Sequence, residues 1–437
     1  MKSRKNDFAH HAKLHDFDKY GDSVQPIQTE TSVALVVEMF SQLGMNLHNW
    51  PISQSIPEPE ILPRHAQLMR RLWSILERLG VVVRKGDMWF RTLSEIKVRP
   101  AQSLLDQIIA EFPQHAEEHR LLSVTGPKLA DCLAGSEDPI KILFHDKGAS
   151  DLMGAVYSNA PMFATMTSML LDVIDQLFPS NSSSEPMWIL EIGAGLGGTT
   201  AGVLEKLKGS GRKVEYTFTD ISPTFVAKAR KRFADYDFVK FKVLDVEKDI
   251  DTAMEGQFDL ILATNVIHAT KDLVMSMTHV RKLLCENGSV ILSEIINGPD
   301  WLDLVWGLLE GWWRFEDGRS YPLQSIDEWS KVFEKAGFGA FTASGGESLE
   351  SQMQQLLVGS VQPIAESMTP EMSASWIMQV SDVETLCYKR VDRLDLLVDI
   401  YWPKQKSLVG KMPIGTYPTI PHTSLVPCTI LITNLQP

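Results

Sequence analysis

The 437-residue sequence has few cysteines and no long apolar run. Its four cysteines are too widely scattered for a metal-binding spacing or a disulfide framework, which favours a reducing compartment. No apolar stretch approaches the roughly 20 residues that a membrane-spanning helix needs. The N-terminal residues MKSRKNDF also lack the following apolar core of a signal peptide. We therefore expect a cytoplasmic protein.

Positive charge is the scarcer of the two signs. The chain has 42 Lys and Arg against 55 Asp and Glu, which gives a net charge of −13 and a pI near 5.4. This excess of acid disfavours nucleic acid or an anionic membrane as the main partner. The length alone predicts two or three domains, and no internal repeat is visible.

The N-terminal part of the chain has mostly helical patterns. Residues 1–30 are polar and lack an apolar period, so we predict a flexible tail there. An amphipathic helix is predicted over 65–80, and a hairpin over 81–91 follows it, as in a winged-helix-like element. Residues 99–180 are again mostly helical. We therefore expect a helical lid or substrate-binding domain over 31–185.

From Met187 the pattern changes to strands that alternate with helices, which is typical of a doubly wound parallel sheet. A domain with this α/β architecture is expected over 186–362. One of its helices is predicted over 271–286, ended by Gly288. The predicted strands cover 187–192, 213–219, 238–244, 258–266 and 289–295, with two closing strands over 338–344 and 354–361 at the sheet edge.

The first of these strands runs into a glycine-rich loop in the segment WILEIGAGLGGTT. Glu191 is followed by Gly193, Gly195 and Gly197, and a helix begins at once. Glycines let the backbone turn tightly and approach a ligand, and the helix N-terminus carries a partial positive charge. The loop is therefore predicted to bind a nucleoside cofactor.

Two cofactors compete for this loop. The glycines also fit the G-x-G-x-x-G fingerprint of a dinucleotide site. A carboxylate at Glu191 would repel a pyrophosphate, whereas it would attract the ammonium and sulfonium of S-adenosylmethionine. The pattern E-x-G-x-G-x-G therefore favours S-adenosylmethionine, with a nicotinamide dinucleotide as the alternative.

Further candidate cofactor ligands lie at the ends of the next strands, where ligands bind in such sheets. Asp220 ends the second strand and could accept hydrogen bonds from both ribose hydroxyls. Asp245 ends the third strand and could accept one from an adenine amino group. Asn265 lies at the end of the fourth strand and completes the predicted cofactor-binding set. No metal site is expected.

A candidate general base and its orienting carboxylate follow from the same topology. His268 comes just after the fourth strand and Glu294 lies near the end of the fifth. If these strands are neighbours, about 4.8 Å apart, the carboxylate can orient the imidazole and stabilise its protonated form. The pair could remove a proton from a carbon or a hydroxyl.

Aromatic residues supply candidates for a substrate wall. Tyr157 precedes a long helix that leads to the glycine-loop strand, and it could donate a hydrogen bond to a substrate oxygen. Trp312 and Trp313 lie in an aromatic run after the fifth strand. They could cover a substrate or simply pack in the core.

Five motifs, in order, resemble one known family: VYSNAP, LEIGAGLGGTT, YTFTDIS, ATNVIHAT and GWWRFEDGR followed by PLQS. They are similar to the C-methyltransferase domain of fungal non-reducing iterative polyketide synthases, a class I methyltransferase, over roughly residues 60–360. Val156 stands where that family often has an aromatic residue.

The resemblance implies a reaction and a set of partners. The substrate would be a poly-β-ketoacyl chain bound as a thioester to an acyl carrier protein, methylated at an α-carbon between two carbonyls. His268 and Glu294 match the family's catalytic dyad. Residues 384–402 resemble the first strands of an α/β-hydrolase-type releasing domain without its G-x-S-x-G motif, so residues 363–437 are expected to be a linker and a truncated start of such a domain. Carriers and other synthase domains would then act in trans.

Three other functions stay open at this point: a free-standing O-methyltransferase acting on a phenol, an inactive remnant of a synthase, and a nicotinamide-dependent reductase.

Overall fold

The computed structural model describes residues 8–177, 185–363, 380–391, 394–403 and 430–433. The chain divides into two compact units, residues 1–364 and residues 365–437. In the second unit, β11 (Val380–Val391), β12 (Leu394–Pro403) and β13 (Ile430–Thr433) form an antiparallel sheet. Strands therefore occur within 384–402, and the hydrolase-like assignment of this segment stays a prediction. The run SNSSSEP over 180–186, whose composition predicts a linker-like loop, lies mostly outside the described residues.

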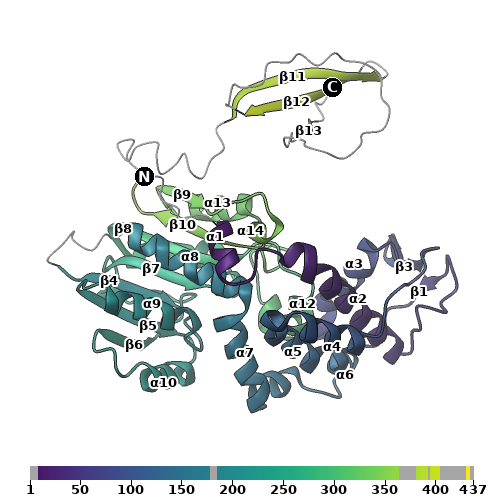
Figure 1. The fold of residues 1–437 in the computed structure, drawn as a ribbon, viewed down its shortest axis with the longest axis horizontal. Coiled ribbons are helices and arrows are strands. Elements are labelled where there is room, and N and C mark those ends of the chain that lie inside the picture. The colour runs from purple at the N-terminus through teal and green to yellow at the C-terminus, as the bar shows by residue number, and fades with distance from the viewer. Residues whose placement is uncertain (1–7, 178–184, 364–379, 392–393, 404–429, 434–437) are drawn as a thin grey trace. The chain divides into compact units, whose positions relative to one another are not determined.

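A seven-stranded sheet forms the C-terminal half of the first unit (Figure 1). The sheet has the order β6-β5-β4-β7-β8-β10-β9. The first five strands in this order are parallel, and β10 is antiparallel to both of its neighbours. The predicted doubly wound sheet is confirmed, except that β10 is inserted between β8 and the edge strand β9. The strands are β4 (Met187–Ile192), β5 (Val214–Asp220), β6 (Val239–Val243), β7 (Phe258–Thr264), β8 (Leu284–Ile295), β9 (Ala340–Ala343) and β10 (Gln354–Ser360).

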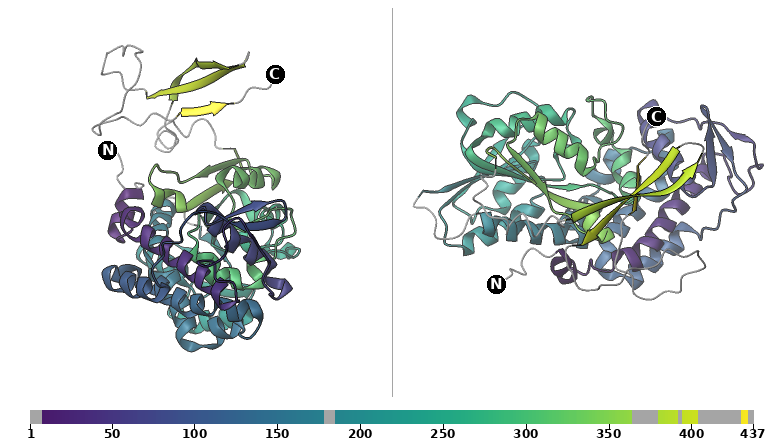
Figure 2. Two further views of the ribbon diagram at one scale, coloured as in Figure 1. Left: turned by 90° about the vertical axis from the view of Figure 1, so that its right-hand side faces the viewer. Right: turned by 90° about the horizontal axis from the view of Figure 1, so that it is seen from above.

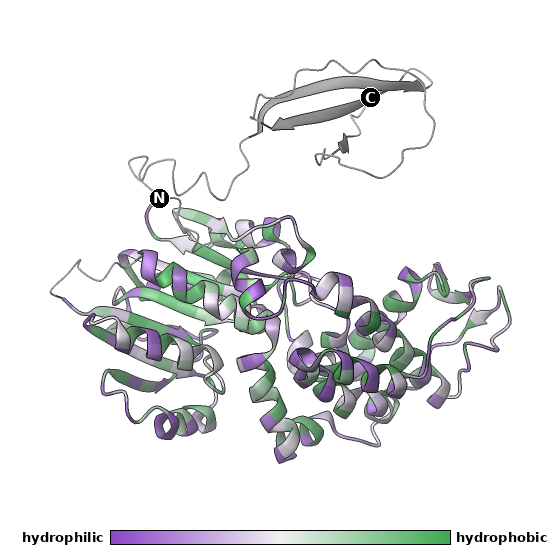
Figure 3. Ribbon diagram, in the orientation of Figure 1, coloured by the Kyte–Doolittle hydropathy of each residue, from purple (hydrophilic) through white to green (hydrophobic). Residues whose placement is uncertain are grey.

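Helices cover both faces of this sheet, which explains why its central strands are apolar throughout. The residues Leu260–Ala263 of β7 are all buried. On one face, α11 (Leu273–Leu283) and α13 (Ile326–Lys335) pack into a shared core with β4, β7 and β8. On the other face lie α8 (Pro161–Leu177) and α9 (Gly198–Gly209). Figure 3 shows the strands of the sheet mostly in the colours of apolar residues.

The predicted end of α11 at Gly288 is wrong. The helix ends at Leu283, β8 begins at Leu284, and Gly288 lies inside that strand. The pairing of β8 with β7 shifts register in this stretch. A Cβ atom on Gly288 would come within 2.8 Å of the Phe258 carbonyl oxygen, so the glycine is needed for close approach of two strands.

The N-terminal half of the unit is helical and gathers beside the sheet (Figures 1 and 2). The predicted hairpin is present, and its strands lie at the end of the unit away from the large sheet. The helices and strands of this N-terminal half are α1 (Phe8–Leu14), α2 (Gln25–Gln42), β1 (Ser55–Ile56), α3 (Ala66–Arg78), β2 (Val82–Lys85), β3 (Met88–Arg91), α4 (Ala101–Glu111), α5 (Ala116–Thr125), α6 (Leu129–Ala134), α7 (Lys147–Asn159) and α8.

The predicted flexible tail over 1–30 is wrong for residues 8–30, which form α1, a π-helical turn and the start of α2. Phe17 and Tyr20 are 1% and 2% exposed in the core. The polar side chains of this segment hide its apolar residues in the sequence, but in the structure several of them have hydrogen-bonding partners. For example, His11 Nδ1 lies 2.9 Å from Ser168 Oγ on α8. Tertiary contacts, rather than local periodicity, order this segment.

The helical half and the sheet half share one core. The larger hydrophobic cluster runs from Ala12 through α3 to Trp301, Leu304 and Met353. The predicted boundary between residues 185 and 186 therefore crosses a continuous packed interior and stays a prediction. Within the described ranges, no helix has both the length and the apolarity that crossing a bilayer requires.

Candidate functional site

A cavity of about 340 Å³ lies at the carboxyl ends of β4, β5, β6 and β7. The strand order changes direction at β4, because β5 pairs with one side of β4 and β7 pairs with the other. A crevice opens at this point at the carboxyl ends of the strands, as in other doubly wound sheets. The polar and aromatic residues that line it are Tyr157, Asp220, Asp245, Glu247, Asn265, His268, Thr270, Trp306, Trp312 and Arg314.

His268 and Glu294 meet at this cavity. His268 lies in the turn after β7, and Glu294 is the penultimate residue of the neighbouring parallel strand β8. His268 Nδ1 is 2.6 Å from Glu294 Oε2, and the side chains are 5% and 0% exposed. The backbone N–H of Ile267 donates to Glu294 Oε1 at 3.1 Å. Both carboxylate oxygens are thus engaged, and the imidazole keeps Nε2 as the nitrogen that can accept a proton.

The glycine loop reaches the cavity through Gly193. All three glycines have positive φ, at 62°, 56° and 77° for Gly193, Gly195 and Gly197. A Cβ on Gly193 would come within 2.2 Å of Val266, so only glycine leaves the floor of the cavity open.

Gly195 and Gly197 are not among the residues that line this cavity, and their predicted part in cofactor binding stays a prediction. The N–H of Gly195 donates to Asp220 Oδ2 at 2.9 Å, and Gly197 is the N-cap of α9. A Cβ on Gly197 would come within 2.7 Å of Phe233. These contacts show that the two glycines shape the loop.

Glu191 is also placed differently from the prediction. Its Oε2 accepts hydrogen bonds from Thr200 and from Tyr216, each at 2.6 Å, and its carboxylate is 2% exposed beneath the loop. Burial raises the pKa of Glu191 to about 7. The residue ties β4 to α9 and β5, and does not face a ligand's charge directly.

The negative charge at the cavity comes instead from Asp220, Asp245 and Glu247. Asp220 accepts from Gly195 and, at 2.7 Å, from the N–H of Ser222, and Asp245 accepts from the N–H of Glu247 at 3.1 Å. Arg314 is a cation on the lining, and it is ion-paired to Glu247. Such a lining disfavours a pyrophosphate and favours a cationic ligand.

Glu247 was missed in the sequence, although it lies two residues after Asp245 in the same strand-end loop. Glu247 Oε1 accepts a hydrogen bond from the N–H of Lys271 at 2.6 Å. This bond connects the loop after β6 to the loop after His268.

Asn265 has a strained backbone, with φ of 51°. Its Oδ1 accepts from the N–H of Ile295 at 3.2 Å, which turns the amide so that Oδ1 points to β8. Its Nδ2 is buried and has no hydrogen-bond partner among the residues that the structure describes. A buried donor of this kind at a cavity is suited to a bound acceptor.

The aromatic residues divide between cavity and core. Tyr157 and Trp306 stack on the cavity with ring centroids 5.6 Å apart, and burial raises the pKa of the Tyr157 hydroxyl. Trp312 lies edge-on to His268, with ring centroids 5.5 Å apart. Trp313 is a core residue whose Nε1 donates to the Gly307 carbonyl at 2.8 Å. Trp306, just before the predicted aromatic run, was missed.

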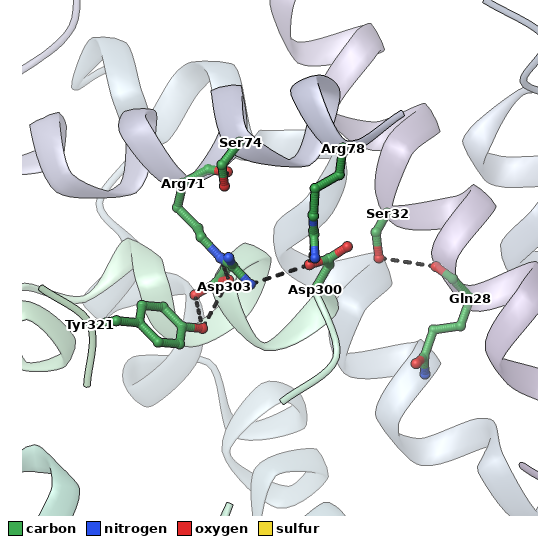
Figure 4. A network of polar contacts seen from close by, with 8 residues as sticks. All are labelled: Gln28, Ser32, Arg71, Ser74, Arg78, Asp300, Asp303 and Tyr321. Carbon is green, nitrogen blue, oxygen red and sulfur yellow. Dashed lines mark hydrogen bonds and ion pairs between the residues drawn. The ribbon is translucent and has the colours of Figure 1, made fainter. Parts of the chain in front are cut away.

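A buried ion network lies behind this aromatic wall (Figure 4). Arg71 on α3 donates to Asp303 at 2.6 Å, and the Tyr321 hydroxyl donates to the same carboxylate at 2.9 Å. Arg71 and Arg78 both reach Asp300, at 3.4 and 2.5 Å. Asp303 belongs to α12 (Trp301–Val305), which runs directly into Trp306. The helical half of the unit thus holds the element that carries the cavity wall.

Family models and known proteins match this chain. A methyltransferase domain family matches residues 190–290, and a methyltransferase helix-turn-helix domain family matches residues 2–89. The non-reducing polyketide synthase prhL of Penicillium brasilianum is 42% identical over 404 residues, which cover 92% of this chain and 16% of that protein. The chain therefore spans about 16% of the length of such relatives.

Solved structures match as well. The C-methyltransferase (CMeT) domain of the citrinin polyketide synthase is 34% identical, with a TM-score of 0.79 that covers 83% of this chain and 95% of that one. The trans-methyltransferase CalH, in complex with SAH, is 23% identical, with a TM-score of 0.56 over 78% of this chain and 91% of that one, which shows a common fold.

The sheet order, the cavity at its switch point and these matches define a class I methyltransferase that uses S-adenosylmethionine. Within that class, the chain belongs to the C-methyltransferase domains of fungal non-reducing polyketide synthases.

The residues at the cavity fit S-adenosylmethionine. Gly193 leaves room where any side chain would intrude, and Asn265 offers a buried unpaired donor in the described structure. The carboxylates of Asp220, Asp245 and Glu247 suit a ligand with two positive centres. The cofactor predicted from the sequence is confirmed. The predicted contribution of Glu191 stays a prediction, since Glu191 lies beneath the loop and is not among the residues that line the cavity.

Proposed function

We propose that this domain methylates the α-carbon of a poly-β-ketoacyl thioester carried by an acyl carrier protein, with His268 as general base and Glu294 as its orienter. The observation that carries the proposal is the buried 2.6 Å contact between His268 Nδ1 and Glu294 Oε2 beside the cavity. A methyl acceptor that is already nucleophilic needs no such base, whereas a carbon acid does.

The roles of the residues follow from their hydrogen bonds. The Nδ1–H of His268 donates to Glu294, so Nε2 accepts the proton from the α-carbon. Glu294 stabilises the resulting imidazolium, and its second oxygen is held by the N–H of Ile267. S-adenosylmethionine supplies the methyl group as an electrophile on a sulfonium, which leaves as a neutral thioether.

Cofactor roles are proposed for the residues at the strand ends. Asp220 would accept from the ribose hydroxyls with the lone pairs that the backbone leaves free. Asp245 would accept from the adenine amino group, and Asn265 Nδ2 would donate to an acceptor on the cofactor. Gly193 would let the cofactor approach the backbone.

Tyr157 is proposed to donate a hydrogen bond to a substrate oxygen. Its raised pKa keeps the hydroxyl protonated, and its ring is held against Trp306 on the cavity. The substrate chain would lie along this aromatic side.

The test is methyl transfer from labelled S-adenosylmethionine to an acetoacetyl thioester of pantetheine, with mass-spectrometric location of the methyl group. We expect methylation at carbon and a loss of kcat of at least about a hundredfold in His268→Gln. Glu294→Gln should lose somewhat less, because the imidazole remains. Binding of S-adenosylmethionine, measured by calorimetry, should change little in either variant.

Three results would contradict the proposal. Transfer to a hydroxyl oxygen would point to an O-methyltransferase. Wild-type turnover in His268→Gln would show that His268 is not the general base. Binding of cofactor without turnover, with carrier-bound acetoacetyl as well as with the pantetheine thioester, would indicate an inactive remnant.

A further inference from the structure

Trp312 has a buried indole N–H that no described residue accepts. It lies in the short helical turn Glu310–Trp313 and lines the cavity. An indole nitrogen can only donate, and native proteins seldom leave such a donor buried and unpaired. The next residue is a contrast, because the N–H of Trp313 donates to the Gly307 carbonyl.

Location separates Trp312 from the other unpaired indole. Within the described part of the chain, Trp329 also has a buried N–H without a partner. Trp329 lies on α13, packs in the core that this helix shares with the sheet, and does not line the cavity. Trp312 lies beside the proposed base, edge-on to His268 at 5.5 Å between ring centroids and 74° between planes. Its donor is therefore next to the place where the substrate would be deprotonated.

The surrounding contacts hold Trp312 in position. Its backbone N–H donates to the Leu309 carbonyl at 3.1 Å, and Arg314, two positions further on, is ion-paired to Glu247. The N–H of Glu316 donates to the Lys271 carbonyl at 2.8 Å, which ties this segment to the loop after His268. These contacts fix the turn that carries Trp312 beside the loop after His268.

We propose that the Nε1–H of Trp312 donates to a carbonyl oxygen of the substrate and stabilises the enolate that forms when His268 removes the α-proton. This rests on the proposed function. The step breaks the C–H bond, moves the proton to His268 Nε2 and spreads the electron pair over the α-carbon and its two carbonyl oxygens. Trp312 keeps its own proton and stabilises the charge where it develops.

The proposal also predicts a preference for β-keto substrates. A 1,3-dicarbonyl unit has two oxygens that gain charge together, and the cavity offers two aromatic donors, Tyr157 and Trp312, on its lining. A simple thioester, which has one carbonyl, would leave one of these donors unpaired.

The test compares Trp312→Phe, which keeps an aromatic ring and removes the N–H, with Trp313→Phe, which removes the neighbouring indole N–H outside the cavity. We expect kcat for acetoacetyl-pantetheine to fall about ten- to a hundredfold in Trp312→Phe and to stay within about threefold in Trp313→Phe. The affinity for S-adenosylmethionine should stay within about twofold in both.

A second readout follows the charge itself. The ultraviolet band of the bound acetoacetyl enolate, titrated against pH, should show a higher apparent pKa of the substrate in Trp312→Phe than in the wild type. Replacement of Trp312 by 3-benzothienylalanine, which has sulfur in place of the N–H in the same ring shape, should give the same shift and separates packing from hydrogen bonding.

Wild-type kcat and an unshifted enolate titration in both Trp312 variants would overturn the proposal, and so would a loss of cofactor affinity equal to the loss of kcat. Parallel measurements on His268→Gln separate the two hypotheses. If that variant is inactive while the Trp312 variants are normal, only the role of Trp312 fails. If that variant is active, the proposed function fails.

Discussion

Glu191 shows how burial changes the meaning of a residue in a familiar motif. The sequence places Glu191 near a positively charged cofactor, where its carboxylate would be ionised. In the structure Glu191 lies beneath the glycine loop and accepts hydrogen bonds from the hydroxyls of Thr200 and Tyr216. Burial, helped by nearby Asp220 and opposed by the two hydrogen bonds, raises its pKa to about 7. The residue stabilises the loop most when it is protonated.

This predicts a specific pH dependence of stability. A carboxyl whose pKa is raised in the folded state binds its proton more tightly there than in the unfolded chain, so stability falls as pH rises from about 4.5 to about 7. The penalty above pH 7 is at most about 3 kcal/mol. Glu191→Gln, whose amide oxygen can accept both hydrogen bonds, should lose this dependence in urea unfolding followed from about pH 5 to about pH 8.

Glu255→Gln, at an exposed acid, is the matched control and should unfold with the wild-type pH dependence. An unchanged slope in Glu191→Gln would mean that Glu191 is ionised throughout this range.

At the scale of elements, α12 joins the helical half of the unit to the cavity. Asp303 is fully buried on it, and burial raises its pKa while Arg71 opposes that effect. The ion pair with Arg71 and the hydrogen bond from Tyr321 compensate the buried charge of the Asp303 carboxylate. They also hold α12, the helix that leads to Trp306, in place (Figure 4).

Arg71→Met should therefore destabilise the protein by about 3–5 kcal/mol, because it leaves the carboxylate of Asp303 buried and without its cation. Arg78→Met, which removes a half-exposed partner of Asp300, should cost no more than about 1 kcal/mol. Chemical denaturation measures both free energies of unfolding.

The double variant Arg71→Met with Asp303→Asn should recover part of the loss, since the uncompensated charge is gone. If Arg71→Met were as mild as Arg78→Met, the network would have no role in holding α12.

At the scale of the whole first unit, the helical half and the sheet half are not independent bodies. Phe17 and Tyr20 near the N-terminus belong to the same hydrophobic cluster as Trp301 and Met353. A helical region that packs this closely is a fixed wall of the site, and not only a cover over it.

We therefore predict that residues 1–364 unfold in one cooperative transition, with equal calorimetric and van't Hoff enthalpies. The segment 186–362 expressed alone should not fold stably, because Trp301, Leu304 and their neighbours would lose their packing partners. Two separate transitions, or a cooperatively folded segment 186–362, would contradict this and would support a domain boundary between residues 185 and 186.

Much of the sheet was predictable from sequence. The alternation of apolar strands and helices gave the correct location of β4, β5, β6, β7 and most of β8, since strands buried on both faces must be apolar throughout. The pairing of His268 with Glu294 was also predictable, because neighbouring parallel strands bring their carboxyl ends together. Residues 8–30 and Gly288 were not, because their structures depend on distant partners and not on a local period.

The sequence by itself determined the class of fold and the kind of chemistry, since the strand period, the glycine loop and the strand-end acids are local patterns with direct physical meaning. Only the tertiary structure decided which of these side chains reach the cavity. It placed Glu191 beneath the loop, brought Glu247 and Trp306 to the lining, and left the N–H of Trp312 without a described partner beside His268. Burial and hydrogen bonding depend on neighbours far apart in the chain, which no local pattern records.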